Sequence, residues 1–347
     1  MRMTRLWKKA LRRIATPCLS VPLALVLGLG TAQAQGHCEG VDLIAQMPAQ
    51  ERARITEIAH AAPYAQGLLW RATRDGQEVV IAGTYHFDDP RHSALVNRLL
   101  PVLDQAASVL VEAGPKEEAQ LKSELMSRPD LMFDPDGPTL PELLPEPDWQ
   151  RLMKAFEARG IPPVFAAKFK PWYAAITISM SPCALRAISE GAVGLDKKIV
   201  AAAEARNLPI RALESYDTAF HLFDDISEAD QRDLLRGALA VEGKSDDMTF
   251  TLANAYFDGE TRLIWAFSDW LARQDKTFPP EVIEKQLELS EEKLMVERNR
   301  AWIPVIEAAS ATSQDKPVLM AAGALHLAGE GGVLNLLAAR GWAITPY

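Results

Sequence analysis

Two apolar segments near opposite ends of the chain end in the same way, and this shared ending constrains the fold more than any other feature. Residues 78–86 run from an apolar stretch into a glycine and then His86, and residues 316–326 do the same with His326. Each run has the length of a buried strand and is followed by a segment of helical character. In open α/β sheets such strand-to-helix junctions line the ligand crevice at the carboxyl edge. The two histidines, 240 residues apart, are therefore expected to meet at one site.

Two glutamates end short apolar segments in a comparable setting. Glu112 follows "SVLV" and Glu214 follows "IRAL", so each carboxylate is expected at the end of a strand. A carboxylate at a buried edge needs a partner, which can be an arginine, hydrogen-bond donors or a metal. Two neutral imidazoles with one or two carboxylates form a ligand set that suits Zn²⁺, Mn²⁺ or Co²⁺. The alternative is that each histidine only caps a neighbouring backbone group.

Arg298 interrupts an apolar stripe on a predicted helix. At helical spacing, Arg298 lies on the same face as four apolar residues. These are Leu287, Leu294, Trp302 and Val305. An arginine in such a stripe pairs with a buried acid or binds an anionic group. Alternatively, its guanidinium reaches water past the apolar surface.

The order of the predicted elements indicates an α/β or α+β domain. Its sheet is expected to be built from strands at both ends of the chain, with a mainly helical middle. Asp75-Gly76 predicts a hairpin between two early strands, and residues 279–309 predict one long helix opened by proline. We expect a single domain over residues 35–347, with a proline- and acid-rich, helical insertion around 115–310.

The first 34 residues have the three-part layout of a secretory signal peptide. Six positive charges and no acid precede a short apolar stretch, which ends in small residues at Ala32 to Ala34. The apolar stretch contains Pro22 and is shorter than the ~18–20 residues that a membrane-spanning helix needs. Cleavage near Ala34 is therefore favoured over membrane anchoring, and we expect export to the periplasm of a Gram-negative bacterium.

The charge of the chain excludes two classes of partner. Removing six positive charges from a chain whose net charge is −9 makes the remainder still more acidic. Such a surface is unsuited to the phosphates of nucleic acids or to anionic lipid, and no later segment could cross a bilayer. We therefore expect no nucleic-acid partner and, after signal cleavage, no membrane partner.

Two cysteines lie outside the expected leader. Cys38 and Cys183 make an even pair in an oxidising compartment, for which a disulfide is the natural interpretation. Two isolated thiols are the alternative.

The motifs, in their order along the chain, resemble those of the TraB/GumN family, also called Tiki-like. They are "VVIAGTYHFDDP", "VLVEAGP", "GLDKKIV", "IRALES", "ERN" and "VLMAAGALHLAGEGGVLNLLAARGW". The resemblance covers nearly the whole chain after the leader, and it implies a fold similar to that of erythromycin esterase and the haem-uptake ChaN-like proteins. Members similar to the animal Tiki proteins are regarded as metal-dependent proteases. The resemblance thus implies metal-site roles for His86, Glu112 and His326, with Glu214 and Arg298 in support.

The function expected first is a periplasmic metal-dependent hydrolase, in particular a peptidase. A metal held by His86, Glu112 and His326 would activate a water molecule. Glu214 would take the proton of that water, and Arg298 would stabilise developing negative charge. One alternative is a metal-free, esterase-like hydrolase in which a histidine is the general base. The other is a non-catalytic regulatory protein that holds a peptide or glycan. In each case a peptide or other small molecule occupies the crevice at the sheet edge.

Overall fold

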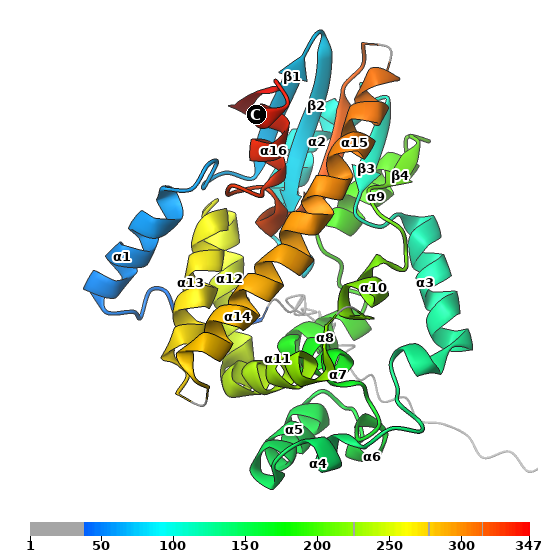
Figure 1. Ribbon diagram of the computed structural model, residues 1–347. Helices are drawn as coiled ribbons and strands as arrows, with labels where there is room; N and C mark the ends of the chain where they lie inside the picture. The colour runs from blue at the N-terminus through cyan, green and yellow to red at the C-terminus, as the bar shows by residue number, and fades with distance from the viewer. Residues whose placement is uncertain (1–37, 225, 277, 314) are drawn as a thin grey trace, which may run out of the picture. The chain divides into compact units, whose positions relative to one another are not determined.

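A single mixed sheet organises the part of the chain that the structure describes (Figure 1). The computed structural model describes residues 38–347 except 225, 277 and 314, so the expected signal peptide at 1–34 lies outside the described residues. The strand order is β4-β3-β5-β2-β1-β6. The strands are β1 (Leu69–Arg74), β2 (Gln77–Thr84), β3 (Ser108–Val111), β4 (Ile210–Ala212), β5 (Val318–Gly323) and β6 (Ala343–Pro346).

Strands β1 and β2 form the predicted hairpin. Arg74 pairs with Gln77, and the turn residues Asp75 and Gly76 have φ angles of 51° and 80°. Two positive φ angles are what a type I′ turn requires. Strand β6, at the end of the chain, pairs antiparallel with β1. The prediction of a sheet built from both ends of the chain is confirmed.

The neighbours β4, β3, β5 and β2 run parallel to one another. Strand β5 is buried along its whole length, and the last six residues of β2 are buried too. This explains why both read as continuous apolar runs rather than as alternating patterns. Because the four strands are parallel, their carboxyl ends lie at the same edge of the sheet.

Helices cover both faces of the sheet (Figure 1). Side chains of β2 alternate between the two faces: Val80 packs into one apolar cluster and Ile81 into the other. The first cluster includes α2 (His92–Leu103) and α9 (Leu195–Glu204), and the second includes α15 (Glu297–Ala311) and α16 (Val333–Ala339). This layered arrangement of helix, sheet and helix confirms the predicted α/β class.

The helical middle falls into two blocks, because α9 and β4 return to the sheet between them. The first block comprises α3 (Pro115–Ser127), α4 (Leu140–Leu143), α5 (Glu146–Ala158), α6 (Pro163–Ala166), α7 (Pro171–Ser179) and α8 (Pro182–Ser189). The second comprises α10 (Thr218–Asp224), α11 (Glu228–Val241), α12 (Ser245–Phe257), α13 (Thr261–Gln274) and α14 (Pro280–Glu291). Three short 3₁₀ turns are η1 (Pro129–Leu131), η2 (Glu242–Lys244) and η4 (Ala324–His326), and α1 (Ala49–His60) precedes the sheet. All six helices of the first block carry proline in their first turn, where its missing N–H costs no hydrogen bond.

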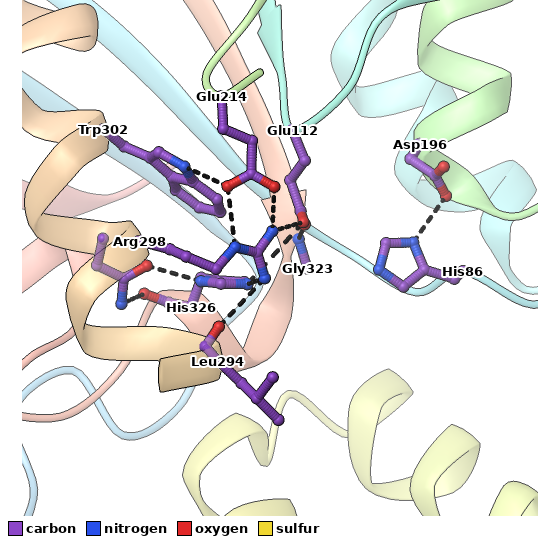
Figure 2. Close-up of polar contacts among 10 residues, drawn as sticks. His86, Glu112, Asp196, Glu214, Leu294, Arg298, Trp302, Gly323 and His326 are labelled. Carbon is purple, nitrogen blue, oxygen red and sulfur yellow. Dashed lines mark hydrogen bonds and ion pairs between the residues drawn. The ribbon is translucent and has the colours of Figure 1, made fainter. Parts of the chain in front are cut away.

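The long helix expected over residues 279–309 forms as one continuous helical segment, but it contains a π-helical turn. Helices α14 and α15 are joined by a π-helical turn, η3 (Glu292–Val296). A π turn shifts the face on which later side chains lie. Leu287 consequently lines a cavity beside α11 and α12, whereas Arg298 faces the sheet edge (Figure 2). The residues of the expected stripe therefore do not share one environment: Leu287 lies at the cavity and Arg298 at the sheet edge.

A disulfide joins Cys38 to Cys183, with Cα atoms 5.7 Å apart, in agreement with the predicted pairing. It links the segment that precedes α1 to the first turn of α8. Among the described helices, none combines the length and the hydrophobicity needed to cross a membrane.

Candidate functional site

The residues expected at the site gather at the carboxyl edge of the parallel strands (Figure 2). Glu112 directly follows β3, and Glu214 lies two residues beyond β4. His86 lies two residues beyond β2, and His326 ends the short turn that follows β5. Arg298 reaches the same edge from α15. The topology thus brings together residues from five separate parts of the chain.

Arg298 is the centre of the polar network. Its Nε and Nη2 donate to the two oxygens of Glu214 at 2.9 and 2.6 Å, and Nη2 also donates to Oε2 of Glu112 at 2.8 Å. Its Nη1 donates to the carbonyl of Leu294 at 3.1 Å and lies 3.3 Å from Nε2 of His326. The side chain is only 15% exposed. Arg298 therefore pairs with buried acids instead of reaching water, the first of the two interpretations of its stripe.

Glu214 holds the guanidinium in place. Besides its two bonds from Arg298, it accepts a hydrogen bond from Nε1 of Trp302 at 3.0 Å. Trp302 is fully buried, and the guanidinium lies 5.1 Å from its ring centroid. Because both oxygens of Glu214 are engaged, this carboxylate orients Arg298 and has little freedom to exchange a proton with a ligand.

His326 is held in one tautomer. Asn299 donates through Nδ2 to the carbonyls of His326 and Gly331 at 3.2 and 2.9 Å, which fixes its Oδ1 as an acceptor. That oxygen lies 2.7 Å from Nδ1 of His326, so Nδ1 carries the proton and Nε2 presents its lone pair toward Arg298. Burial of the ring is the main cause that lowers the pKa of His326, which falls to about 4. The negative charge of Glu112 opposes this shift, and the positive charges of Arg298 and His86 add to it. The ring is neutral at neutral pH.

Glu112 is ionised and doubly bonded. Its Oε1 accepts a hydrogen bond from the backbone N–H of Gly323 at 2.6 Å, and its Oε2 accepts the bond from Arg298. Burial alone would raise the pKa of Glu112, but His326, His86, Arg298 and this amide together lower the pKa to about 2. A carboxylate with such a pKa keeps its negative charge throughout the neutral range.

His86 stands apart from the arginine network, beside α9 (Figure 2). Its Nδ1 lies 3.4 Å from Oδ1 of Asp196, a separation typical of an ion pair rather than of a close hydrogen bond. Its side chain is 59% exposed, so this ring is the accessible member of the site. Interaction with Asp196 raises the pKa of His86 above its usual 6.5. Partial desolvation of the ring by the surrounding protein opposes the rise, and the charge of Glu112 adds to it.

Gly323 provides a small open space between these side chains. A Cβ placed on Gly323 would lie 3.3 Å from Oε1 of Glu112, 3.5 Å from Nε2 of His86 and 3.6 Å from Cδ2 of His326. The three residues expected from the sequence to act together therefore surround one point, and the lack of a side chain at Gly323 keeps that point free.

The same residues do not fit a metal ion in this arrangement. Oε2 of Glu112 and Nε2 of His326 are 4.0 Å apart, but both face Arg298, whose positive charge repels a second cation. Within the described ranges, no group of three or more His, Cys, Asp or Glu residues has the geometry of a metal site. Each histidine nevertheless has a side-chain oxygen facing its Nδ1, as metal-ligating histidines commonly do.

Sequence reasoning missed three residues of the site in these roles: Asp196, Asn299 and Trp302. Gly323 was expected as the glycine of the second motif. Asp196 lies within "GLDKK" and Asn299 within "ERN", so both were inside motifs that carried the family resemblance. No spacing rule connects either of them to a histidine. Trp302 was placed on the stripe with Arg298, but the hydrogen bond from its indole to an acid has no local signal.

The comparison with known proteins agrees with the motifs. No curated protein and no solved structure matches the chain, so the expected likeness to erythromycin esterase and ChaN-like proteins is not confirmed. The family model described as TraB/PrgY/gumN matches residues 68–346, which include every residue of the site described above. The chain belongs to the TraB/PrgY/gumN family.

Proposed function

We propose that the protein is a hydrolase of peptide or ester bonds, with its reaction centre at the sheet edge around His86, Glu112 and His326. One observation carries the proposal: Nδ1 of His86 faces Asp196, while Nε2 of the same ring faces the open space at Gly323. An imidazole that has a carboxylate behind it and a free nitrogen in front is the arrangement that activates nucleophiles in many hydrolases. The substrate would be a peptide or other small molecule in the crevice.

His86 suits the role of general base better than its neighbours do. A general base works best when its pKa lies near the operating pH. The pKa of His86 is raised from 6.5, whereas the pKa of Glu112 is about 2 and that of His326 is about 4. Of the three, His86 is therefore the residue whose pKa is raised rather than lowered, and its ring is exposed.

The proposed reaction uses water as the nucleophile. Nε2 of His86 accepts a proton from water as the water oxygen bonds to the carbonyl carbon, and the carbonyl electron pair moves to its oxygen. That pair then reforms the double bond, the bond to the leaving nitrogen or oxygen breaks, and the leaving group takes the proton from His86. The products are a carboxylic acid and an amine or alcohol. Asp196 stabilises the imidazolium that exists between the two proton transfers.

Glu112, Arg298 and Glu214 support this reaction centre without transferring a proton themselves. Glu112 presents a fixed negative charge that also favours the imidazolium of His86. In the described contacts, all five N–H groups of Arg298 point to acceptors, so we assign Arg298 the role of positioning Glu112 and His326. Glu214 in turn positions Arg298. These roles differ from the proton transfer and charge stabilisation expected from the sequence.

A metal-dependent hydrolase is the second candidate. It is favoured by the gathering of His86, Glu112 and His326 around the position next to Gly323, and by the oxygen partner of each histidine. A bound divalent ion would supply a Lewis acid there. This candidate requires Arg298 to leave the space between Glu112 and His326, and for that reason we rank it second.

We further propose that the protein acts in the periplasm after cleavage near Ala34. The leader composition supports export. The disulfide between Cys38 and Cys183 is in keeping with an oxidising compartment.

Turnover by a matched pair of histidine variants tests the proposal. The parent, His86→Gln and His60→Gln are assayed on a peptide library and on 4-nitrophenyl acetate, each with and without EDTA. His60 is the control because it pairs with Glu260, away from the sheet edge. We expect His86→Gln to lower kcat/KM by roughly 10²- to 10⁴-fold, with no effect of His60→Gln or EDTA. Loss of activity in EDTA that Zn²⁺, Mn²⁺ or Co²⁺ restores would favour the metal-dependent candidate. Absence of turnover by the parent on both substrate classes would favour a non-catalytic binding protein.

A further inference from the structure

A large apolar cavity lies among the helices of the helical middle. It has a volume of about 460 Å³ and is lined by α7, α11, α12, α13 and α14. This volume falls within the ~300–1,000 Å³ of small-molecule sites. Tyr85 and Phe87 also reach its wall, but His86 between them and the other residues assigned to the reaction centre are not part of the described lining. The cavity is therefore separate from the site at the sheet edge.

The cavity lies where two apolar clusters face each other. Helices α7 and α11 pack with α5 in one cluster, against which Ala238 lies. Helix α13 packs with α1 in the other, against which Met248 and Leu271 lie. All three of these side chains line the cavity. Apolar side chains that face an open space lack the close contacts of a packed core. A ligand of matching shape would supply those contacts, and its own apolar surface would leave water.

Four hydroxyl groups in the lining already donate to backbone carbonyls of the protein. Three of them bond within their own helix at 2.7 to 3.0 Å or less than 0.1 Å outside that range; they are those of Ser179, Thr249 and Ser268, at 2.8, 3.0 and 2.9 Å. The fourth, that of Tyr85, donates to the carbonyl of Thr249 at 3.2 Å. A sugar or a peptide would need many hydrogen bonds to replace those it makes with water. Hydroxyls that are bonded within the protein supply few of them, so the wall favours a hydrocarbon.

The charged groups in the described lining are all acids, and each of them has a partner. Glu242 pairs with Arg159 at 2.8 Å, and Asp233 lies 3.9 Å from Arg236. Asp275 also interacts with another group of the protein. A charged ligand group buried against this part of the protein would therefore lose its water without gaining an unpaired counter-charge. This favours an uncharged ligand.

We infer that this cavity is a second binding site, which takes the hydrocarbon part of an uncharged ligand such as a long-chain alcohol. The inference goes beyond the proposed function and does not depend on it. The apolar side chains of two clusters supply the contacts, and the bonded hydroxyls and paired acids select against polar and charged ligands. Because the cavity is finite, it also limits the length of the chain that it can hold.

Gly237 on α11 allows the cavity to be filled from its own wall. A Cβ on Gly237 would meet no atom within 4 Å, and leucine has a better helix propensity than glycine. Gly237→Leu therefore adds an isobutyl group at the wall, and Ala272→Leu fills the cavity independently from α13. Gly243→Leu is the control, because its Cβ position is equally open, it is exposed, and it lies outside the described lining. Far-UV circular dichroism and the melting temperature check that each variant is folded.

The first measurement is binding of N-phenyl-1-naphthylamine, an uncharged fluorescent probe, to the parent and the variants. Each buried methylene favours binding by roughly fourfold. The loss of space for two or more carbons should therefore weaken binding at least about tenfold in Gly237→Leu and in Ala272→Leu. Gly243→Leu should bind the probe as the parent does. No binding by the parent, or equal binding by the parent and the folded cavity variants, would overturn the inference.

The second measurement is displacement of the probe by 1-alkanols from hexanol to dodecanol. We expect the affinity to rise by roughly two- to fourfold per methylene until the chain fills the cavity, and then to level off. The affinity should level off at a shorter chain in Gly237→Leu than in the parent. A rise that continues identically in both proteins is expected of adsorption to an outer surface and would overturn the inference.

The charge of the ligand is tested with decanoate and decyltrimethylammonium. We expect 1-decanol to displace the probe at concentrations at least about tenfold lower than either ion, because each ion would have to give up its hydration or leave part of its chain outside. Equal displacement by either ion would overturn the assignment to uncharged ligands. None of these measurements requires turnover, so this inference and the proposed hydrolase can fail independently of each other.

Discussion

Nδ1 of His326 lies 2.7 Å from Oδ1 of Asn299, whose own N–H groups are bound to two backbone carbonyls. This relationship fixes both the protonated nitrogen of the ring and its orientation. Nε2 is consequently turned toward Arg298 and Glu112. The neutral, buried His326 and the exposed His86 are thus chemically different, although the sequence presents them in identical motifs.

Asn299→Asp should raise the pKa of His326 from about 4. The new carboxylate would accept the Nδ1 proton with a full negative charge, which favours the imidazolium. A titration followed by ¹⁵N NMR of the histidine rings measures the change. Asn335→Asp is the control, because Asn335 also donates to a backbone carbonyl but is only half-buried and is bonded to Glu330. An unchanged titration of His326 in Asn299→Asp would contradict the assigned contact.

His326 also predicts a dependence of stability on pH. Its pKa is about 4 in the folded protein and 6.5 unperturbed, so the unfolded chain binds the additional proton between these values. The corresponding stability is complete above pH 6.5 and is lost as the pH falls toward 4. Its size is about 3 kcal/mol. We expect the free energy of unfolding in urea to decline across this window in the parent and to decline less, by that amount, in His326→Gln. Equal slopes in the two proteins would contradict this.

Much of the site geometry could be predicted, because the sequence shows where the strands end. The apolar runs before His86, Glu112, Glu214 and His326 predicted strands, and parallel strands put their carboxyl ends at one edge. The class of fold and the hairpin at Asp75-Gly76 were predictable for the same reason: each depends on a pattern within about ten residues.

The partners of the histidines could not be predicted, because they depend on contacts between distant elements. Asp196 is brought to His86 by the packing of α9 on the sheet, 110 residues further along the chain. The position of Arg298 relative to the carboxyl edge of the sheet depends on the π-helical turn before α15. Such π turns have no reliable local sequence signature. The sequence predicted His86, Glu112 and His326 as metal ligands but did not predict that Arg298 would contact Glu112 and His326. The spacing of residues along a helix does not reveal which strand end an arginine on that helix will contact.

Asp196→Asn should move the acid limb of the pH–activity profile to lower pH. The interaction with Asp196 is the main cause of the raised pKa of His86, and an amide in its place carries no charge to stabilise the imidazolium. The acid limb of kcat/KM reports the pKa of the free base. We expect a shift toward 6.5 or below and a fall in activity of roughly 10-fold or more. Asp88→Asn is the control from the same loop, since Asp88 pairs with Lys198; a shift of equal size there would contradict the assignment.

Reduction of the disulfide should destabilise the fold without changing the site. Cys38 and Cys183 enclose a long loop, with 145 residues of separation, and such bridges contribute on the order of 2–4 kcal/mol. The double variant Cys38→Ser, Cys183→Ser should show this loss in urea unfolding while keeping the kcat/KM of the parent under native conditions. Two free thiols per chain in denatured, unreduced protein isolated from its own cells would show that the bridge does not form.

Gly323→Ala tests the reaction centre itself. The backbone angles of Gly323, φ −48° and ψ 133°, are open to any residue, so alanine introduces no backbone strain. Its Cβ would lie 3.3 Å from Oε1 of Glu112 and 3.5 Å from Nε2 of His86, in the space that the attacking water needs. We expect kcat/KM to fall by about 100-fold or more, as the loss of a correctly positioned reactant implies, with a change of about 1 kcal/mol or less in the free energy of unfolding. Gly243→Ala, whose Cβ position is open and exposed, should match the parent in both measurements. If Gly323→Ala hydrolyses its substrate as fast as the parent does, the reacting water does not occupy the space between His86 and Glu112, and the proposed centre is wrong.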